Sequence, residues 1–253
     1  MTQFSANLGF LWSDLALPEA IFAAKAAGFA AVECHWPYDT PATQTAQALR
    51  DAGLRMLGIN TVRGNPGENG LSALPGREVE ARAAIDQALS YAARIGAGMV
   101  HVMAGFASGP EAQAVFVANL SYAVQRAQGQ SITILIEPLN RHDAPGYFLQ
   151  TTEQARDIIG LVGAPNLRLM FDCYHVGRTE GDITTRFSDL QPIIGHVQFA
   201  SVPDRGPPDH GELDYATIFA AIAQAGWTAP LGAEYKPKGP TADSLGWMAR
   251  FPA

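Results

Sequence analysis

Short apolar runs alternate with longer alanine-rich segments along the whole chain. Short runs rich in branched or aromatic side chains are typical of buried strands, whereas apolar positions that repeat every three or four residues are typical of helices. The short runs predict strands at 4–11, 31–36, 55–60, 99–104, 132–137, 167–172, 194–200 and 230–235. The longer segments predict helices at about 18–28, 41–52, 77–95, 110–127, 151–162, 184–191, 214–225 and 241–250.

Residues at the predicted helix ends agree with this division. Thr151 and Gln154 have the spacing of a capping box, and Pro41 suits the first turn of a helix. A glycine follows several of the predicted helices, as a C-cap requires. These glycines are Gly28, Gly53, Gly96, Gly163 and Gly226.

Strand–helix units that recur about every 30 residues are typical of a (β/α)8 barrel, a TIM barrel of about 250 residues. No linker divides the chain, so we expect one α/β domain over residues 1–253. Two connections that follow strands, 61–76 and 201–213, are too long for simple turns. In a barrel both would lie over the C-terminal mouth, where they could act as lids or be plain surface loops.

Composition and charge exclude several functional classes. Hydrophobic residues make up 47% of the chain and charged residues 16%, and no apolar run is long enough to cross a bilayer. The first residues lack the pattern of a secretory signal, so we expect a cytoplasmic protein. Cys34 and Cys173 lack the spacing of a zinc or redox site and are expected to be reduced thiols. The net charge of −7 argues against a nucleic-acid partner.

Oxygen-bearing side chains end four consecutive predicted strands. They are Glu137, Asp172, Gln198 and Glu234, with separations of 35, 26 and 36 residues. Each separation is close to one strand–helix unit, so a barrel would place the four on adjacent strands at one rim. Any one of them alone could be a paired structural residue. Three carboxylates together repel one another unless a cation neutralises them, and an all-oxygen set suits Mg²⁺ or Mn²⁺.

Four further polar residues interrupt or follow these strands. His175 lies three residues beyond Asp172 and is a candidate substrate donor or proton relay. His196 lies on the same strand face as Gln198, one layer deeper, and is either structural or a support for that ligand. His101 and Glu33 are either satisfied core residues or functional ones.

The candidate cations for an anionic substrate are few. Arg205, in the long loop after Gln198, could grip a carboxylate with both guanidinium arms. Lys236, two residues beyond Glu234, either binds substrate or is a solvated loop charge. Tyr147 and Phe148 either wall the pocket or pack the loop after Glu137.

Several ordered segments resemble the hydroxypyruvate isomerase family, within the xylose isomerase-like TIM barrels. They are HVMAG (101–105), IEPLN with DAPGYFL (136–149), FDCYH (171–175), GHVQFASVPDR (195–205), GELDY (211–215) and EYKP (234–237). The resemblance implies a divalent metal held by Glu137, Asp172, Gln198 and Glu234. It also implies that Glu137 and Glu234 are the acid/base pair. The segments CHWPYD (34–39) and 61–70 look less typical of the family.

The implied reaction converts hydroxypyruvate to tartronate semialdehyde by proton transfer through a metal-stabilised enediolate, with a hydride shift as the rival route. Related 2-oxo-tetronate isomerases share most of the pattern, so a 2-oxo-tetronate remains an alternative substrate. Sugar 3-epimerases of the superfamily typically have His where Gln198 stands, which makes a ketose 3-epimerase more remote. Abasic-site endonucleases use a histidine-rich zinc cluster and resemble this chain poorly. A barrel that binds a ligand without catalysis is a further alternative. The sequence does not determine whether the chain forms a homo-oligomer.

Overall fold

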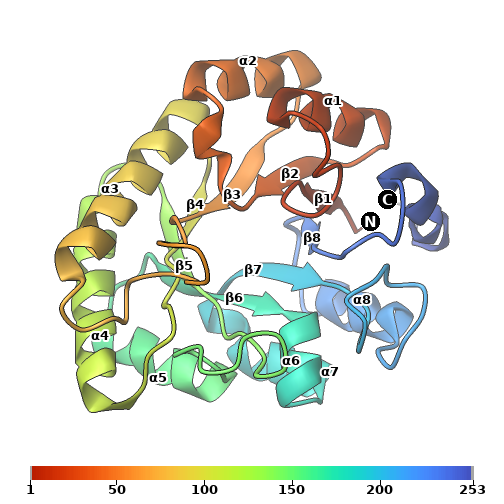
Figure 1. Ribbon diagram of the computed structural model, residues 1–253. Coiled ribbons are helices and arrows are strands. Elements are labelled where there is room, and N and C mark those ends of the chain that lie inside the picture. The colour runs from red at the N-terminus through yellow and green to blue at the C-terminus, as the bar shows by residue number, and fades with distance from the viewer. Residues whose placement is uncertain (1, 252–253) are drawn as a thin grey trace.

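Eight parallel strands form a closed barrel in which each strand pairs with the next and β8 pairs with β1. The computed structural model describes residues 2–251 (Figure 1). The strands are β1 (Phe4–Asn7), β2 (Ala31–Cys34), β3 (Met56–Asn60), β4 (Met99–His101), β5 (Thr133–Ile136), β6 (Leu167–Asp172), β7 (Ile194–Phe199) and β8 (Leu231–Ala233). The predicted number, order and barrel architecture of the strands are confirmed.

Helices surround the barrel and pack their apolar faces on it (Figure 1). They are α1 (Leu17–Ala26), α2 (Ala42–Ala52), α3 (Glu78–Ile95), α4 (Gly109–Arg126), α5 (Thr152–Val162), α6 (Cys173–Thr179), α7 (Ile183–Leu190) and α8 (Tyr215–Gln224). Short 3₁₀ segments are η1 (Pro37–Asp39), η2 (Gln191–Ile193), η3 (Thr241–Ser244) and η4 (Gly246–Arg250). Seven of the predicted helices correspond to α1–α5, α7 and α8.

The helix ends agree with most of the predicted caps. The Thr151 side chain accepts a hydrogen bond from the backbone N–H of Gln154. The Gln154 side chain accepts from the N–H of Gln150, one residue before the cap, so the second half of the capping box is displaced. Helix α2 begins at Ala42, so Pro41 is the N-cap residue directly before the helix and not a residue of its first turn, as had been predicted.

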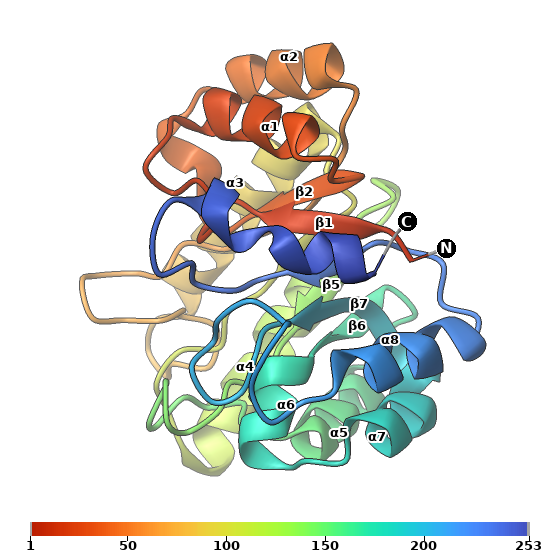
Figure 2. The same ribbon diagram turned by 90° about the vertical axis from the view of Figure 1, so that its right-hand side faces the viewer.

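The predicted helix at 241–250 is wrong, because two 3₁₀ segments follow β8 there. Trp247 in η4 is fully buried and packs edge-on against Phe4 and Phe199, with ring centroids 4.9 and 5.4 Å apart. Its indole N–H donates to the hydroxyl of Tyr235. The segment therefore runs beside β1 (dark blue in Figure 2), held by one aromatic anchor rather than by a helical apolar face.

Helix α6 was not predicted. It begins directly after Asp172, whose side chain caps it by accepting from the N–H of Tyr174. With seven residues, including Gly177, it is too short to show a helical period. Cys173 is the buried first residue of this helix.

Long loops extend from the carboxyl end of the barrel. The connections after β3, β5 and β7 lie at the same end of the molecule (Figure 2). They include the predicted loops 61–76 and 201–213, which contain few regular elements. The barrel therefore presents one loop-covered mouth, at which parallel strands direct their last side chains.

No helix among the described residues is long and apolar enough to cross a membrane.

Trp247→Ala should lower the free energy of unfolding by about 3–5 kcal/mol, because it empties a fully packed aromatic site. Urea unfolding followed by circular dichroism measures the change. Leu161→Ala on α5 is the control, since Leu161 is 61% exposed and should change stability by less than about 0.5 kcal/mol. A loss below about 1 kcal/mol for Trp247→Ala would contradict the anchoring role.

Candidate active site

The four oxygen-bearing residues lie at the carboxyl ends of four neighbouring strands. Asp172 ends β6 and pairs in register with Gln198 of β7, which in turn pairs with Gly232 of β8. Glu137 and Glu234 directly follow β5 and β8. All four side chains are buried. The structure therefore brings the predicted rim residues to one end of the barrel.

A cavity of about 390 Å³ opens above these residues at the loop-covered mouth. Its lining includes His35, His101, Glu137, His175, Arg205, Glu234 and Lys236. Gln198 lies deeper, beside Glu33 and His196 in the barrel interior. Five of the seven predicted site residues therefore line the cavity, namely Glu137, His175, Arg205, Glu234 and Lys236, whereas Asp172 and Gln198 do not.

Three buried oxygen atoms at this rim have no hydrogen-bond donor among the described residues. They are Glu137 Oε1, Asp172 Oδ2 and Gln198 Oε1. The orientation of the Gln198 amide follows from its neighbour, because Gln198 Nε2 donates to Glu33 Oε2 at 2.8 Å. A buried acceptor without a donor costs about 1–3 kcal/mol, and more when it is charged. Glu137 and Asp172 offer carboxylate oxygens within 4.8 Å of each other, and the Gln198 oxygen is also unpaired, so the chemistry of this donor set fits a hard divalent cation.

Burial and mutual repulsion change the ionisation of two of the carboxyl groups. Burial raises the pKa of Glu137 well above its ordinary value, and the charges of Glu234 and Asp172 raise it further. Burial and the charge of Glu234 raise the pKa of Asp172 to about 7, although the Arg205 charge partly offsets the increase. Without a cation, part of this cluster therefore holds protons near neutral pH.

Glu234 has a different environment. Its Oε1 accepts from Asn7 Nδ2 at 3.0 Å and contacts His35 Nε2 at 2.6 Å. Its Oε2 accepts from Arg205 Nη2 at 2.6 Å. Burial alone would raise the pKa of Glu234, but the Arg205 charge and the His35 contact lower it below its ordinary value. Glu234 is therefore ionised, whereas Glu137 tends to be protonated.

His175 is held as a hydrogen-bond donor toward the carboxylates. Its Nδ1 accepts from the backbone N–H of Asn140 at 3.0 Å, which places the ring hydrogen on Nε2. Nε2 lies 3.8 Å from Glu137 Oε1 and 3.7 Å from Asp172 Oδ2. Burial, aided by the Arg205 charge, lowers the pKa of His175 to about 3, so the ring is neutral. Glu137, Asp172 and His175 together could hold a metal ion, but the tautomer makes His175 a donor rather than a ligand.

The deeper polar residues support this rim. Glu33 accepts from Ser5 Oγ at 2.5 Å and from Gln198 Nε2, and it lies 3.0 Å from His196 Nε2. Burial alone would raise the pKa of Glu33, but His196 and the two hydrogen bonds lower it. His101 Nδ1 lies 3.5 Å from Glu137 Oε2, and burial lowers the pKa of His101 to about 4. Glu33 thus orients Gln198, His196 lies beside Glu33, and His101 is a neutral neighbour of Glu137.

Arg205 and Lys236 approach the cavity over one aromatic ring. The Arg205 guanidinium lies 4.9 Å from the centre of the Phe10 ring and 5.0 Å from that of Tyr174. The Lys236 ammonium lies 5.2 Å from the centre of the Phe10 ring. Arg205 is already bonded to Glu234, whereas Lys236 has no ion pair within residues 2–251. Lys236 is therefore the more available of the two for a substrate anion.

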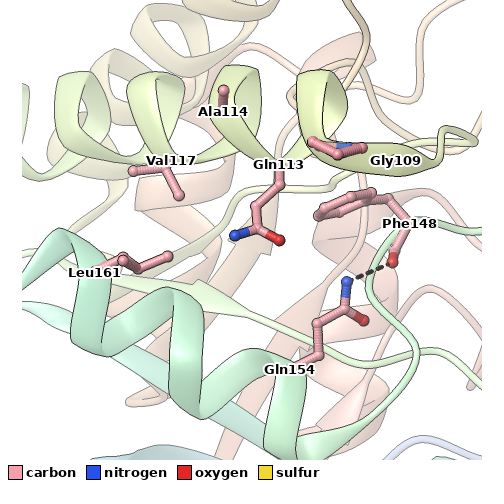
Figure 3. Close-up of a pocket in the computed structure, with 8 residues that line it drawn as sticks. Gly109, Gln113, Ala114, Val117, Phe148, Gln154 and Leu161 are labelled. Carbon is pink, nitrogen blue, oxygen red and sulfur yellow. Dashed lines mark hydrogen bonds between the residues drawn. The ribbon is translucent and has the colours of Figure 1, made fainter.

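Tyr147 and Phe148 pack loops and do not wall the cavity. The Tyr147 hydroxyl accepts from the N–H of Ala104, and Phe148 packs edge-on against Phe116 of α4. Phe148 instead borders an outer groove between α4 and α5 (Figure 3). The residues that line this groove are uncharged and include Gln113, Ala114, Val117, Gln154 and Leu161. They offer no acid/base or metal-binding group.

Four residues at the site were missed in the sequence. Asn7 and His35 contact Glu234, Asn140 orients His175, and Arg63 stacks 4.3 Å above the Trp36 ring at the cavity mouth. Asn7 and His35 fell inside the predicted strands 4–11 and 31–36, although the strands end at Asn7 and Cys34. A polar residue at a true strand end was the available signal. For Asn140 and Arg63, in loops, no periodic signal exists.

Comparison with known proteins agrees with this geometry. Residues 21–251 match the family model described as xylose isomerase-like TIM barrel. The 2-oxo-tetronate isomerase of Cupriavidus necator is 40% identical over 99% of both chains. The hydroxypyruvate isomerase of Escherichia coli is 35% identical over 98% of both chains. The crystal structure of AP endonuclease, family 2, from Brucella melitensis covers both chains fully, with a TM-score of 0.96 and 35% identity.

More distant structures share the fold alone. One is 3-keto-D-glucoside 4-epimerase from E. coli, with a TM-score of 0.82 and 20% identity over 99% of both chains. Both curated relatives are named isomerases and match this chain over nearly their full length, so the predicted family resemblance is confirmed. The chain is an isomerase and belongs to the xylose isomerase-like TIM barrel family.

Proposed function

We propose that the chain is a divalent-metal-dependent isomerase of a small hydroxy-oxo acid, which interconverts hydroxypyruvate and tartronate semialdehyde in the cytoplasm. The observation that carries the proposal is the set of three buried oxygens without donors, one of them on Glu137, near the ionised Glu234. The names of the relatives, hydroxypyruvate isomerase and 2-oxo-tetronate isomerase, support the substrate class. A 2-oxo-tetronate is the alternative substrate.

Glu137, Asp172, Gln198 and Glu234 would hold Mg²⁺ or Mn²⁺. Three of them each offer one unpaired oxygen, and Glu234 remains ionised near them. When bound, the cation would polarise the carbonyl and hydroxyl oxygens of the substrate and so acidify the adjacent C–H bond. Oxygen ligands from carboxylates and an amide suit these hard cations.

The protein's own groups would move the proton. One of Glu137 and Glu234 removes the proton from the hydroxyl-bearing carbon, and the other delivers a proton to the former carbonyl carbon. A hydrogen must also pass between the two substrate oxygens. The Nε2–H of His175, which faces Glu137 and Asp172, would donate its hydrogen to the former carbonyl oxygen, and Nε2 would take up the hydrogen of the original hydroxyl group, so that the ring ends neutral as it began. General acid/base assistance of this kind contributes about 10²–10⁴-fold to the rate.

Cations at the mouth would hold the substrate carboxylate. Lys236 lies at the cavity mouth, and Arg205 lies between the rings of Phe10 and Tyr174. Since Arg205 also bonds Glu234, it would link the acid/base pair to the bound anion. A three- or four-carbon acid would fit a cavity of about 390 Å³.

Two other activities have weaker support. A ketose 3-epimerase is the more remote alternative, because Gln198 stands where His is typical of those enzymes. The Brucella melitensis protein is named an AP endonuclease. We propose no nucleic-acid partner for this chain, because its net charge is −7. An abasic-site nicking assay tests that choice directly.

A substrate panel tests the proposed activity. Hydroxypyruvate, 2-oxo-tetronates and ketohexoses are supplied to metal-stripped protein, with Mg²⁺ or Mn²⁺ added back. We expect isomerisation of the hydroxy-oxo acids and little or no turnover of ketohexoses, because the mouth offers cations for a carboxylate. Faster turnover of a ketohexose would contradict the proposal.

Glu137→Gln and Glu234→Gln should each lower kcat by about 10²–10⁴-fold, because each removes one partner of the acid/base pair. Steady-state kinetics with the best substrate of the panel measures the loss. Glu212→Gln, in the exposed loop after β7, is the matched control and should keep full activity. The acid/base assignment fails if neither rim variant loses activity.

Mn²⁺ affinity should fall as the pH is lowered from 8 to 6. The raised pKa values of Glu137 and Asp172, about 7 for Asp172, mean that the cation must displace protons that are bound at the lower pH. We expect the Kd to increase about tenfold or more over this range, as measured by calorimetry. Glu111→Gln on α4 is a control that should leave the dependence unchanged. A Kd independent of pH would contradict metal binding by these two carboxylates.

A further inference from the structure

We infer that His35 is a positioning residue for Glu234, which it holds in the orientation needed for metal binding and proton transfer. The inference rests on the proposed function of Glu234. His35 has no part in the acid/base pair or in the proposed metal-ligand set. It acts through a direct contact with one carboxylate oxygen.

The contact between His35 and Glu234 is short and buried. His35 Nε2 lies 2.6 Å from Glu234 Oε1, and the two side chains are 10% and 6% exposed. Because a carboxylate oxygen only accepts, the ring hydrogen lies on Nε2. Hydrogen bonds to an ionised acceptor are shorter and stronger than bonds between neutral groups. The contact therefore fixes Oε1 on the side of the barrel formed by β1 and β2.

A second donor acts on the same oxygen. Asn7 Nδ2 donates to Glu234 Oε1 at 3.0 Å, and Asn7 Oδ1 accepts from the N–H of Gly9. The bond from Gly9 orients the Asn7 amide, so its NH₂ group faces Glu234. With Oε1 engaged by two donors, Oε2 is the oxygen presented on the side of Arg205. Oε2 accepts from Arg205 Nη2, so a cation or a substrate proton at this atom would share it with Arg205.

The His35 ring is itself confined on several sides. It packs edge-on against Phe10, with ring centroids 4.9 Å apart, and lies 5.0 Å from the Trp36 ring. Gly9 covers the Nδ1 side: a Cβ atom at Gly9 would come within 2.0 Å of Nδ1. The φ of Gly9 is not positive, so its backbone does not require glycine. The missing side chain at Gly9 is needed to leave room for the imidazole.

Three substitutions at His35 separate positioning from packing. His35→Gln keeps an N–H donor at about the reach of Nε2, whereas His35→Phe keeps the aromatic contacts and His35→Leu keeps only bulk. We expect Leu and Phe to lower kcat and Mn²⁺ affinity by about 10–100-fold, with KM within about twofold of the wild type. Gln should restore both to within about threefold. Urea unfolding of each variant confirms that the fold is retained.

A packing role predicts the opposite order. Full activity and Mn²⁺ affinity in His35→Phe would overturn the inference, as would a His35→Gln variant as impaired as His35→Leu. Mn²⁺ binding is measured by electron paramagnetic resonance without substrate, so the metal readout does not depend on which acid is isomerised. His142→Leu, at an exposed loop position, is the control histidine and should leave both readouts unchanged.

Gly9→Ala provides an independent test, because it displaces His35 without removing the imidazole. We expect losses similar to those of His35→Leu. In a His35→Ala background the added methyl group meets no ring. There Gly9→Ala should lower kcat and Mn²⁺ affinity by less than about threefold relative to His35→Ala alone. Gly239→Ala, where a Cβ would meet nothing within 4 Å, is the matched control. Equal losses from Gly9→Ala in both backgrounds would show that Gly9 does not act through His35.

The two readouts also separate this inference from the proposed function. If the wild type isomerises none of the acids but His35→Leu still weakens Mn²⁺ binding, the substrate class is wrong and the role of His35 stands. If the wild type isomerises hydroxypyruvate while kcat and Mn²⁺ affinity are unchanged in His35→Leu, the role of His35 is wrong and the proposed function stands. Absence of both activity and Mn²⁺ binding in the wild type would overturn both.

Discussion

At the carboxyl end of this barrel, oxygen atoms are buried without hydrogen-bond donors, and the free-energy cost of that burial is the constraint on which the site depends. Glu137 Oε1, Asp172 Oδ2 and Gln198 Oε1 are all enclosed and all lack a hydrogen-bond partner among the described residues. Such atoms destabilise a fold unless the surroundings or a ligand compensate for the missing hydrogen bonds. Parallel strands bring them together because every strand ends at the same mouth. The wall of the barrel is apolar, and the chemistry is confined to its rim.

The donors around the rim are distributed unevenly, and this asymmetry gives each residue a different task. Glu234 is surrounded by donors from Asn7, His35 and Arg205, so it stays ionised and fixed. Glu137 has one oxygen without any donor, and its pKa is raised. Glu234 thus carries a fixed negative charge, whereas Glu137 exchanges its proton easily and keeps one oxygen free of donors. The proposed proton transfer uses both properties.

Local patterns in the sequence were sufficient to predict the barrel and the four residues at the ends of its strands. The strands are short, apolar and regularly spaced, and parallel topology then places Glu137, Asp172, Gln198 and Glu234 at one end. Local patterns failed where structure depends on distant contacts. Trp247 anchors a non-helical segment through rings far away in the chain, and helix α6 is too short to show a period.

The residues that support the rim were the hardest to predict. His35 and Asn7 lie 199 and 227 residues before Glu234, and neither separation nor residue type indicates the contact. The tautomer of His175 and the amide orientation of Gln198 likewise follow from single bonds to Asn140 and Glu33. Such bonds exist only once the barrel has closed. They determine which atoms can bind a cation, and the sequence alone does not show them.

Anomalous X-ray scattering from Mn²⁺-soaked crystals tests the central claim most directly. The predicted result is one peak about 2.1 Å from oxygens of Glu137, Asp172, Gln198 and Glu234, with His175 Nε2 outside bonding distance. A peak bonded to His175 Nε2 in place of Gln198, or no peak beside Glu137, would contradict it.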